Sequence, residues 1–325
     1  MASSPNALSL DPAHRFVTRE PLTQSLAHAA VLQDCGWACI FVGASFLIAQ
    51  QRKDGLSARM QRPRTIDTGL LATVMPQMGL KRLVIEAPCR AHLIDSDNTR
   101  HALAYSPGTE EAYAAKVKAF GGVACSPVAL TKTHVIDLAN GIEATVQNFS
   151  SIARRNTRRA VRSTEIRYET IPFSQMTASL GAAIAELHVL FRQDRPWMID
   201  QSRLRRAILG QFGDKGWFSL AWRGRQLVGA VYMLMHDRVA SYHTAISHPE
   251  ALAARVPTGL VYHAMHEATL RGCDLFDFVG LYDDRYPERY VRWKGFSTFK
   301  MRFGGTSIAY PPSVAITHEP TTKSV

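Results

Sequence analysis

The second half of the chain alternates between strand-like and helical patterns of apolar residues. Residues 216–222, 226–235 and 239–246 are apolar runs separated by short basic segments, a pattern typical of an antiparallel meander. Ser202–Phe212 is expected to form a helix. A helix before it is predicted by apolar residues at helical spacing, namely Leu180, Ala183, Ile184, Leu187 and Phe191. After the meander we expect a helix over 258–271 and a buried strand over 275–280.

The first half mixes the same two patterns. Apolar segments at 38–52 and 82–87 predict strands, and residues 69–78 and 110–120 are expected to be helical. The expected fold class is therefore α/β (α+β), with mixed sheets flanked by helices. A chain of 325 residues suits two domains of about 150 residues each. We place these domains at 21–130 and 131–311, between a flexible N-terminal segment at 1–20 and a flexible tail at 312–325.

The order of elements in the second domain is that of a GNAT-type acyltransferase. Two helices precede three antiparallel strands, and a helix and a further strand follow. In such a fold the sheet splays after the meander, and the next helix points its N-terminus into the gap, where it can bind an anion. We therefore expect a GNAT-like fold for the second domain.

Aromatic and basic residues alternate near the C-terminus, over residues 292–305. Read as a strand, this segment places Trp293, Phe299 and Phe303 on one face, while Lys294 and Lys300 point to the other. This interpretation predicts one packed face and one face that lines a positively charged cleft. A bulge at Gly295 would break the alternation.

A second basic pattern follows a helical period. On a helix over residues 146–162, one side carries Val146, Phe149, Ala153, Ala160 and Val161. The opposite arc carries the five arginines Arg154, Arg155, Arg158, Arg159 and Arg162. They are either a solvated face paired with nearby acids or a patch that binds phosphates, for which arginine is well suited.

Composition favours an anionic partner. The formal net charge is +11 and the isoelectric point is about 9.6, which suits nucleic acid, a phosphorylated small molecule or a membrane surface. No apolar run reaches the ~18 residues of a spanning helix, and the N-terminus lacks the pattern of a signal peptide. Five cysteines without a second closely spaced pair indicate a reduced, cytoplasmic protein. We further expect no stable insertion in a membrane, and a monomer or a dimer.

Three motifs, in this order, resemble the FemABX family of aminoacyltransferases, which pair two GNAT-like domains. They are THVIDL followed by the arginine-rich helix (133–163), GCDLFDFVG (272–280) and FKMRFGG (299–305). The resemblance covers residues 130–310 and is weaker before them. It implies two tandem GNAT-like acyltransferase domains, of which the first is degenerate and the second carries the active site. It implies transfer of an aminoacyl group from aminoacyl-tRNA to an amine of a cell-wall precursor or a peptide-like natural product. Aminoacyl-tRNA would then be a co-substrate, and no metal or other cofactor is expected.

The resemblance also implies roles for individual residues. Lys300 matches the lysine of the family's Phe-Lys motif, where a cation can neutralise an oxyanion or the donor's ribose-phosphate end. Asp277 and His243 are candidate proton acceptors, although Asp277 can instead cap a loop and His243 can be structural. The substrate-binding candidates are Tyr242, Arg192, Arg195, Phe299, Arg292 and Lys294, and the arginines of residues 154–162 are the candidate tRNA contacts.

Two other functions stay open. A GNAT acyltransferase using acyl-CoA needs an Arg/Gln-x-x-Gly-x-Gly/Ala turn, whose N–H groups bind the pyrophosphate. The corresponding segment, AARVPTGLVYHAM (253–265), has one glycine, a proline and the wrong spacing from Arg255, which counts against CoA. The arginine-rich helix alone would also suit a non-catalytic RNA-binding module.

Overall fold

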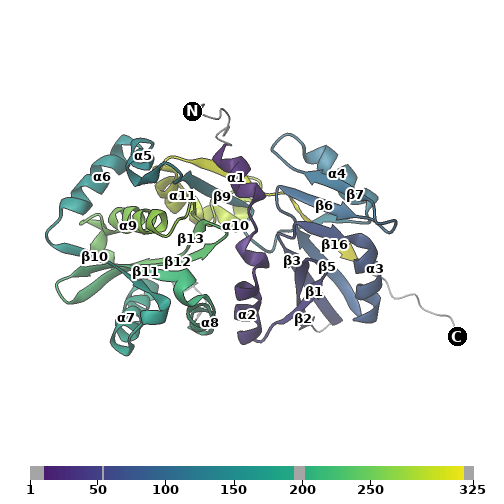
Figure 1. Cartoon of the computed structure of the whole chain (residues 1–325), viewed down its shortest axis with the longest axis horizontal. Coiled ribbons are helices and arrows are strands. Elements are labelled where there is room, and N and C mark those ends of the chain that lie inside the picture. The colour runs from purple at the N-terminus through teal and green to yellow at the C-terminus, as the bar shows by residue number, and fades with distance from the viewer. Residues whose placement is uncertain (1–10, 53–54, 194–201, 318–325) are drawn as a thin grey trace, which may run out of the picture.

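The computed structural model describes residues 11–52, 55–193 and 202–317. It contains two α/β units that lie side by side (Figure 1). The mixed α/β fold predicted from the sequence is confirmed. Each unit has a large mixed sheet with its own buried apolar core.

The N-terminal unit is built on a six-stranded sheet. Its strand order is β1 (Ala38–Val42), β2 (Ser45–Arg52), β3 (Gly55–Gln61), β5 (Leu80–Glu86), β16 (Ser313–Thr317) and β8 (Val123–Cys125). A smaller sheet contains β4 (Thr65–Asp67), β6 (Arg90–Ile94) and β7 (Arg100–Ala104), and the helices are α3 (Thr68–Gln77) and α4 (Glu110–Ala119). The strand predicted over 38–52 is a hairpin, because the chain turns at Gly43 between β1 and β2.

The C-terminal unit is built on a seven-stranded sheet. Its order is β10 (Ile166–Pro172), β11 (Gly216–Arg223), β12 (Gln226–His236), β13 (Val239–Ser247), β14 (Leu275–Asp277), β9 (Lys132–Asp137) and β15 (Thr306–Ala309). The strands from β10 to β13 are antiparallel, whereas β14 runs parallel to β13. The predicted meander is therefore confirmed, and it is nearly continuously apolar because helices cover both of its faces.

Helices cover the two faces of this sheet. One face carries α5 (Gly141–Gln147), α6 (Ser151–Arg162) and α9 (Val256–Leu270), and the other carries α7 (Ala178–Gln193) and α8 (Ser202–Phe212). The predicted helices at 178–193, 202–212 and 256–270 are confirmed to within a few residues. The apolar side predicted for the arginine-rich helix holds for Phe149, Ala153 and Ala160, but Val161 is exposed.

Both ends of the described chain differ from the predicted flexible segments. Within 1–20, Pro12–Thr18 is the helix α1, and within 312–325, residues 313–317 are β16. Strand β16 lies between β5 and β8, so the C-terminus returns to complete the N-terminal sheet. After α1 come a 3₁₀ turn at Leu22–Gln24 and helix α2 (Leu26–Asp34). Helix α2 contacts both α8 and β1. The two units are thus joined by three crossings of the chain.

Residues 292–301 are helical, so the strand predicted over 292–305 is wrong. Val291–Trp293 is a 3₁₀ turn and Lys294–Met301 is α11, which follows the short helix α10 (Pro287–Tyr290). The spacing of Trp293, Phe296, Ser297 and Lys300 already fits a helix period, and Ser297 and Lys300 are buried. Gly305, with φ of 88°, follows α11 where a Cβ would lie 2.3 Å from the carbonyl oxygen of Val135.

Candidate active site

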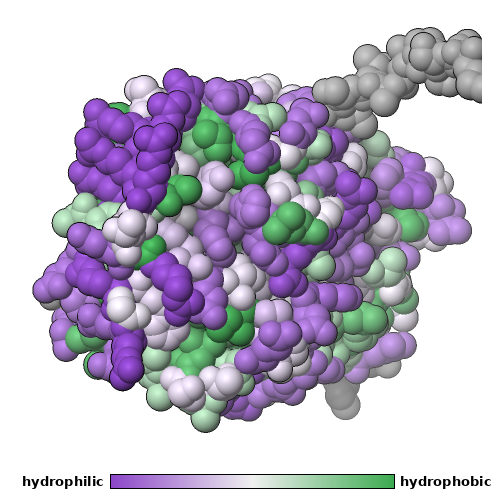
Figure 2. Space-filling model, turned by 60° about the vertical axis from the view of Figure 1, so that its left-hand side comes forward, coloured by the Kyte–Doolittle hydropathy of each residue, from purple (hydrophilic) through white to green (hydrophobic). Residues whose placement is uncertain are grey.

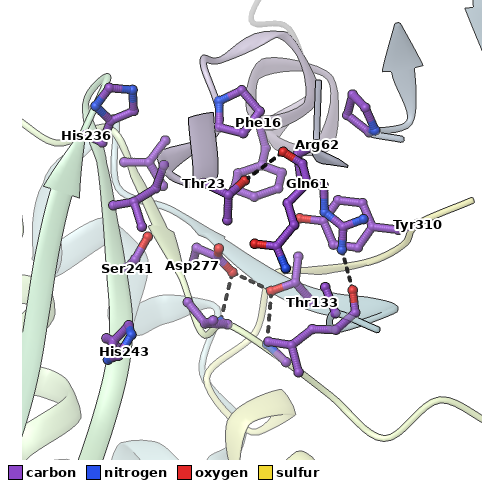
Figure 3. A pocket seen from close by; sticks show the side chains of 18 of the residues that line it. Phe16, Thr23, Gln61, Arg62, Thr133, His236, Ser241, His243, Asp277 and Tyr310 are labelled. Carbon is purple, nitrogen blue, oxygen red and sulfur yellow. Dashed lines mark hydrogen bonds between the residues drawn. The ribbon is translucent and has the colours of Figure 1, made fainter. Parts of the chain in front are cut away.

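A cavity of about 770 Å³ lies between the two units. The end of α1 and the residues after it form one wall, the ends of β3 and β5 form a second, and β13, β14 and the segment before β9 form a third. Figure 3 shows Asp277, Thr133, Ser241, His243 and Arg62 around it. Among the described residues this is the cavity into which the predicted catalytic side chains of β13 and β14 project.

Asp277 is the last residue of β14 and lies at the cavity wall, 9% exposed. Its Oδ1 accepts hydrogen bonds from the Thr133 hydroxyl and, at 2.9 Å, from the backbone N–H of Val279. Within the part of the chain that is described, its Oδ2 accepts no hydrogen bond. Burial raises the pKa of this carboxyl despite the two donors. A carboxylate with one fixed oxygen and one open oxygen can accept a proton from a bound amine.

Lys300 lies behind this carboxylate and does not line the cavity. It projects from α11, is 8% exposed, and donates hydrogen bonds of 2.8 Å to the backbone carbonyls of Phe278 and Gly280. Burial lowers its pKa to about 8, although the charge of Asp277 opposes the shift. The prediction that Lys300 faces a cleft is wrong, because its ammonium is already bonded to the loop after β14. Its two hydrogen bonds hold the loop that follows Asp277 in place.

The loop after β14 has an unusual backbone. Val279 and Gly280 have φ values of 48° and 102°, a region that a β-branched residue seldom adopts. The N–H of Val279 bonds Asp277 and the N–H of Gly280 bonds the Thr133 hydroxyl at 3.4 Å. The carbonyls of Phe278 and Gly280, which accept hydrogen bonds from Lys300, lie at this turn. These bonds hold the strained backbone in the conformation in which the Val279 N–H donates to Asp277.

His243 lies at an irregularity of β13. In the pairing with β12, Tyr232 is opposite Thr244 and Met233 is opposite Tyr242, so the register passes over His243. The side chain lines the cavity, and its Nδ1 lies 3.0 Å from the Thr244 hydroxyl. Burial lowers its pKa to about 4, which keeps the imidazole neutral at pH 7.

Arg62 was not predicted from the sequence. It follows β3 with φ of 54°, and its guanidinium lies 3.4 Å from the Tyr310 ring centroid. It donates to the carbonyls of Ala87 and Leu130, and the short contact with Leu130 crosses from the N-terminal to the C-terminal unit. Figure 3 shows this bond at the edge of the cavity. No sequence pattern marks this residue, because its partners are distant in the chain.

The other predicted substrate-binding residues lie away from the cavity. Tyr242 points to the opposite face of β13, where its ring packs against Phe276 and Phe278 at 6.1 and 5.4 Å. Phe299 packs on the same core through Phe303. Arg292, Lys294 and Arg192 do not line it either, and Arg195 lies outside the described residues. Tyr242 therefore lies in the core, and Phe299 packs against it as the packed face predicted for residues 293, 299 and 303 requires.

Comparison with known proteins shows which fold this is. Residues 147–294 match the family model of the acetyltransferase (GNAT) domain. The crystal structure of FemX is similar over 94% of both chains, with a TM-score of 0.71 and 11% identity. This chain has the FemX fold. A search of curated proteins for similar sequences found no match.

Two further structures share the FemX fold with this chain. One is the C-terminal domain of a proposed lysylphosphatidylglycerol synthetase from Agrobacterium fabrum, with a TM-score of 0.59, 14% identity and coverage of 95% and 91%. The other is L-PGS from Bacillus licheniformis, with a TM-score of 0.56, 10% identity and coverage of 92% and 88%. The FemABX resemblance predicted from the sequence is thus confirmed in the fold, and an acyltransferase is supported at this coarse level.

The helix start that binds an anion in GNAT folds is closed here. Pro257 has no N–H to donate, and the N–H groups of Thr258 and Gly259 both bond the carbonyl of Arg255, at 3.0 and 3.1 Å. The Tyr168 ring covers Gly259, where a Cβ would lie 2.0 Å from the hydroxyl oxygen. These contacts leave little of the N–H cradle that a pyrophosphate requires.

The gap between β13 and β14 is also filled on the side of α9. Pairing between the two strands ends at Ser241 and Asp277. Beyond it, the rings of Tyr242 and Phe278 meet edge to face at 5.4 Å within the core that includes α9. Access to Asp277 is therefore from the opposite side, through the cavity between the two units.

The arginines of α6 form an exposed basic surface in this FemX-like fold. Arg155, Arg158, Arg159 and Arg162 are exposed and make no hydrogen bond or ion pair with another described residue. Arg154 is partly buried and bonds the carbonyl of Gln147 at 2.7 Å. Figure 2 turns the side with α6 and α7 forward, and hydrophilic side chains cover most of that face. The alternative that these arginines are paired with nearby acids is not what the described residues show.

The described residues show neither a metal-binding cluster nor a membrane-spanning helix. They contain no group of three or more histidine, cysteine or acidic side chains arranged to hold a metal ion. No helix among them combines the length and apolar character needed to cross a membrane.

Proposed function

We propose that this protein is an aminoacyltransferase that moves an aminoacyl group from aminoacyl-tRNA to an amine, in the cavity beside Asp277. The observation that carries the proposal is the closed start of α9, which lacks a free N–H cradle for the pyrophosphate of CoA. The FemX fold and the unpaired arginines of α6 support it. An acceptor on a cell-wall precursor or a peptide-like natural product, and a cytoplasmic location, remain predictions.

Asp277 is the group best placed to handle the proton of this reaction. The acceptor enters as an ammonium and transfers one proton to Oδ2 of Asp277, and the neutral nitrogen then attacks the ester carbonyl of the donor. The new C–N bond forms, the C–O bond to the tRNA ribose breaks, and the proton on Asp277 passes to the leaving oxygen. The nitrogen releases its second proton to water as it becomes the amide. A carboxyl whose pKa is raised by burial is better matched to this shuttle than an exposed one.

The oxyanion that forms on the ester carbon needs a donor. The ladder irregularity at His243 leaves a backbone position without a partner in register on β12, beside the cavity. We assign the backbone N–H of His243 as the oxyanion donor, because fixed N–H groups aimed at developing charge lower the barrier. The side chain of His243, which is neutral, then contributes to the shape of the cavity and not to its charge.

The tRNA body is bound by the exposed surface of α6. Four unpaired guanidinium groups on one helix face suit a phosphate backbone. No residue of α6 lines the cavity, so this surface binds the tRNA away from its aminoacyl end.

The test is a donor comparison with purified protein and product mass spectrometry. Total tRNA charged by synthetases is offered in one arm and a panel of acyl-CoAs in the other, each with a small-molecule extract as the source of acceptors. Transfer from charged tRNA that RNase abolishes is the expected result. RNase-resistant transfer from acyl-CoA alone would instead establish the second candidate, a GNAT N-acyltransferase, which the family match over 147–294 favours.

A further inference from the structure

The cavity has one polar end and a largely apolar remainder. Asp277, Thr133, Ser241 and His243 gather at one end, as Figure 3 shows. The rest of the wall is mainly apolar and includes Phe16, Leu22, Leu130, Leu204, Val239 and Trp293. A small polar acceptor would leave most of these apolar side chains exposed to water, whereas a bulky apolar group would cover them.

The polar end offers one open hydrogen-bond acceptor of negative charge. Oδ1 of Asp277 is occupied by Thr133 and Val279, so Oδ2 is the atom left for a ligand. Lys300 is turned toward two backbone carbonyls on the other side of the loop. The Arg62 guanidinium, which lines the cavity, bonds the carbonyls of Ala87 and Leu130. An ammonium group in the cavity would therefore find Oδ2 available.

The apolar wall supplied by the N-terminal segment is held in place before any ligand binds. Arg15 contacts Asp137 at 2.5 Å, and Arg19 contacts Asp274 at 2.7 Å and Asp237 at 3.6 Å. On the other side of the cavity, the Thr23 hydroxyl donates to the carbonyl of Gln61. Residues 16–23 are thus fixed to both units, and a preformed wall binds without the cost of ordering it.

From this arrangement we infer that the acceptor is a primary amine carried on a bulky apolar or aromatic group. Its ammonium pairs with Oδ2 of Asp277, and its apolar part fills the space between Phe16, Leu204 and Trp293. The inference rests on the proposed function only for the site of the reaction, and it adds the class of acceptor. Each methylene that the wall covers is expected to strengthen binding about fourfold.

The test is binding of three probes, phenethylamine, 2-phenylethanol and ethanolamine, measured at pH 7 by ligand-observed NMR and calorimetry. Phenethylamine carries both features, and each of the other two lacks one. We expect phenethylamine to bind at least ~10-fold more tightly than either, because 2-phenylethanol lacks the ion pair and ethanolamine lacks the aromatic contact.

Variants link the two preferences to residues. Asp277→Asn should remove the preference for phenethylamine over 2-phenylethanol, and Phe16→Ala should weaken both aromatic probes about tenfold. Phe41→Ala is the matched control, because Phe41 is 55% exposed and does not line the cavity; it should change nothing. Ethanolamine binding as tightly as phenethylamine, an amine preference that survives Asp277→Asn, or no binding of any probe would overturn the inference. None of these arms contains tRNA, so their failure would leave the donor assignment to the RNase experiment.

Discussion

Replacing Lys300 with methionine tests how a buried ammonium is held behind the active site. Methionine keeps the length of the side chain but leaves the carbonyls of Phe278 and Gly280 without a donor. Each buried group that loses its partner costs about 1–3 kcal/mol. The variant no longer buries a charge, however, and that saving offsets part of the loss at pH 7.

The magnitude of the saving follows from the pKa. Burial lowers the pKa of Lys300 from the ordinary value of 10.5 to about 8. Since one pKa unit corresponds to 1.36 kcal/mol, charging this amine in the folded protein costs about 3 kcal/mol more than in the unfolded chain.

The sign of the pH dependence is fixed by the same comparison. Between about pH 8 and pH 10.5 the unfolded chain keeps a proton that the folded protein has lost, so wild-type stability rises with pH in this window. Lys300→Met has no such proton. The free energy of unfolding of the wild type minus that of the variant should be flat below pH 7 and rise by about 2 kcal/mol by pH 9.5.

Urea denaturation of both proteins at half-unit steps from pH 6 to pH 9.5 measures this difference. Taking the difference cancels every group that titrates alike in both proteins. Lys294→Met, an exposed lysine on the same helix, is the control and should give a flat difference. Parallel curves for wild type and Lys300→Met would refute the reasoning, because Lys300 would then titrate as an ordinary exposed lysine does.

Three further predictions concern the site, the tRNA surface and the join between the units. Asp277→Asn should lower kcat by about 10²–10⁴ and remove the acidic limb of the pH–rate profile, which wild type shows as pH falls through the raised pKa of Asp277. An unchanged kcat would exclude it as the base. Gln at all four exposed arginines of α6 should flatten the log–log salt dependence of tRNA binding by roughly 0.7–0.9 per lost phosphate contact, and an unchanged slope would show a merely solvated face. Arg285→Met should destabilise the protein by about 3–5 kcal/mol in urea denaturation, because Arg285 pairs with Asp283, which is 1% exposed, and also bonds Tyr105 of the N-terminal unit; a loss under 1 kcal/mol would contradict this.

The elements that the sequence predicts correctly are those whose pattern is local. The meander follows from apolar runs broken by turn residues, and α9 follows from its helical period. The strand predicted over 275–280 is correct for Leu275–Asp277 only, and a turn with positive φ at Val279 and Gly280 follows it. The segment 292–305 was misread because aromatics at 293, 299 and 303 satisfy a two-residue alternation, while Trp293, Phe296, Ser297 and Lys300 satisfy a helix period equally well. Strand β16 is too short and too far from β5 for any local pattern to show where it pairs.

The residues of the site likewise fall into those that a local pattern predicts and those that it does not. Asp277 and His243 were singled out from β14 and β13, and the structure brings both to one cavity. Arg62, Thr133 and the residues after α1 reach that cavity only because distant segments meet between the two units, which residue spacing does not encode. Lys300 was predicted to face a cleft, but it lies behind the loop that follows β14. The direction of its side chain is set by α11, which replaces the predicted strand.

The measurement that tests the central claim most directly follows a labelled amino acid from tRNA into product in a single turnover. Charged tRNA carries the label in an ester, which mild alkali cleaves, whereas an amide product resists it. With wild-type protein and an amine acceptor, the account predicts alkali-stable label at the rate at which ester is lost, and about 10²–10⁴-fold less on the same timescale with Asp277→Asn. Label that stays on the tRNA with the wild type, or an amide yield equal for wild type and Asp277→Asn, would contradict transfer at this site.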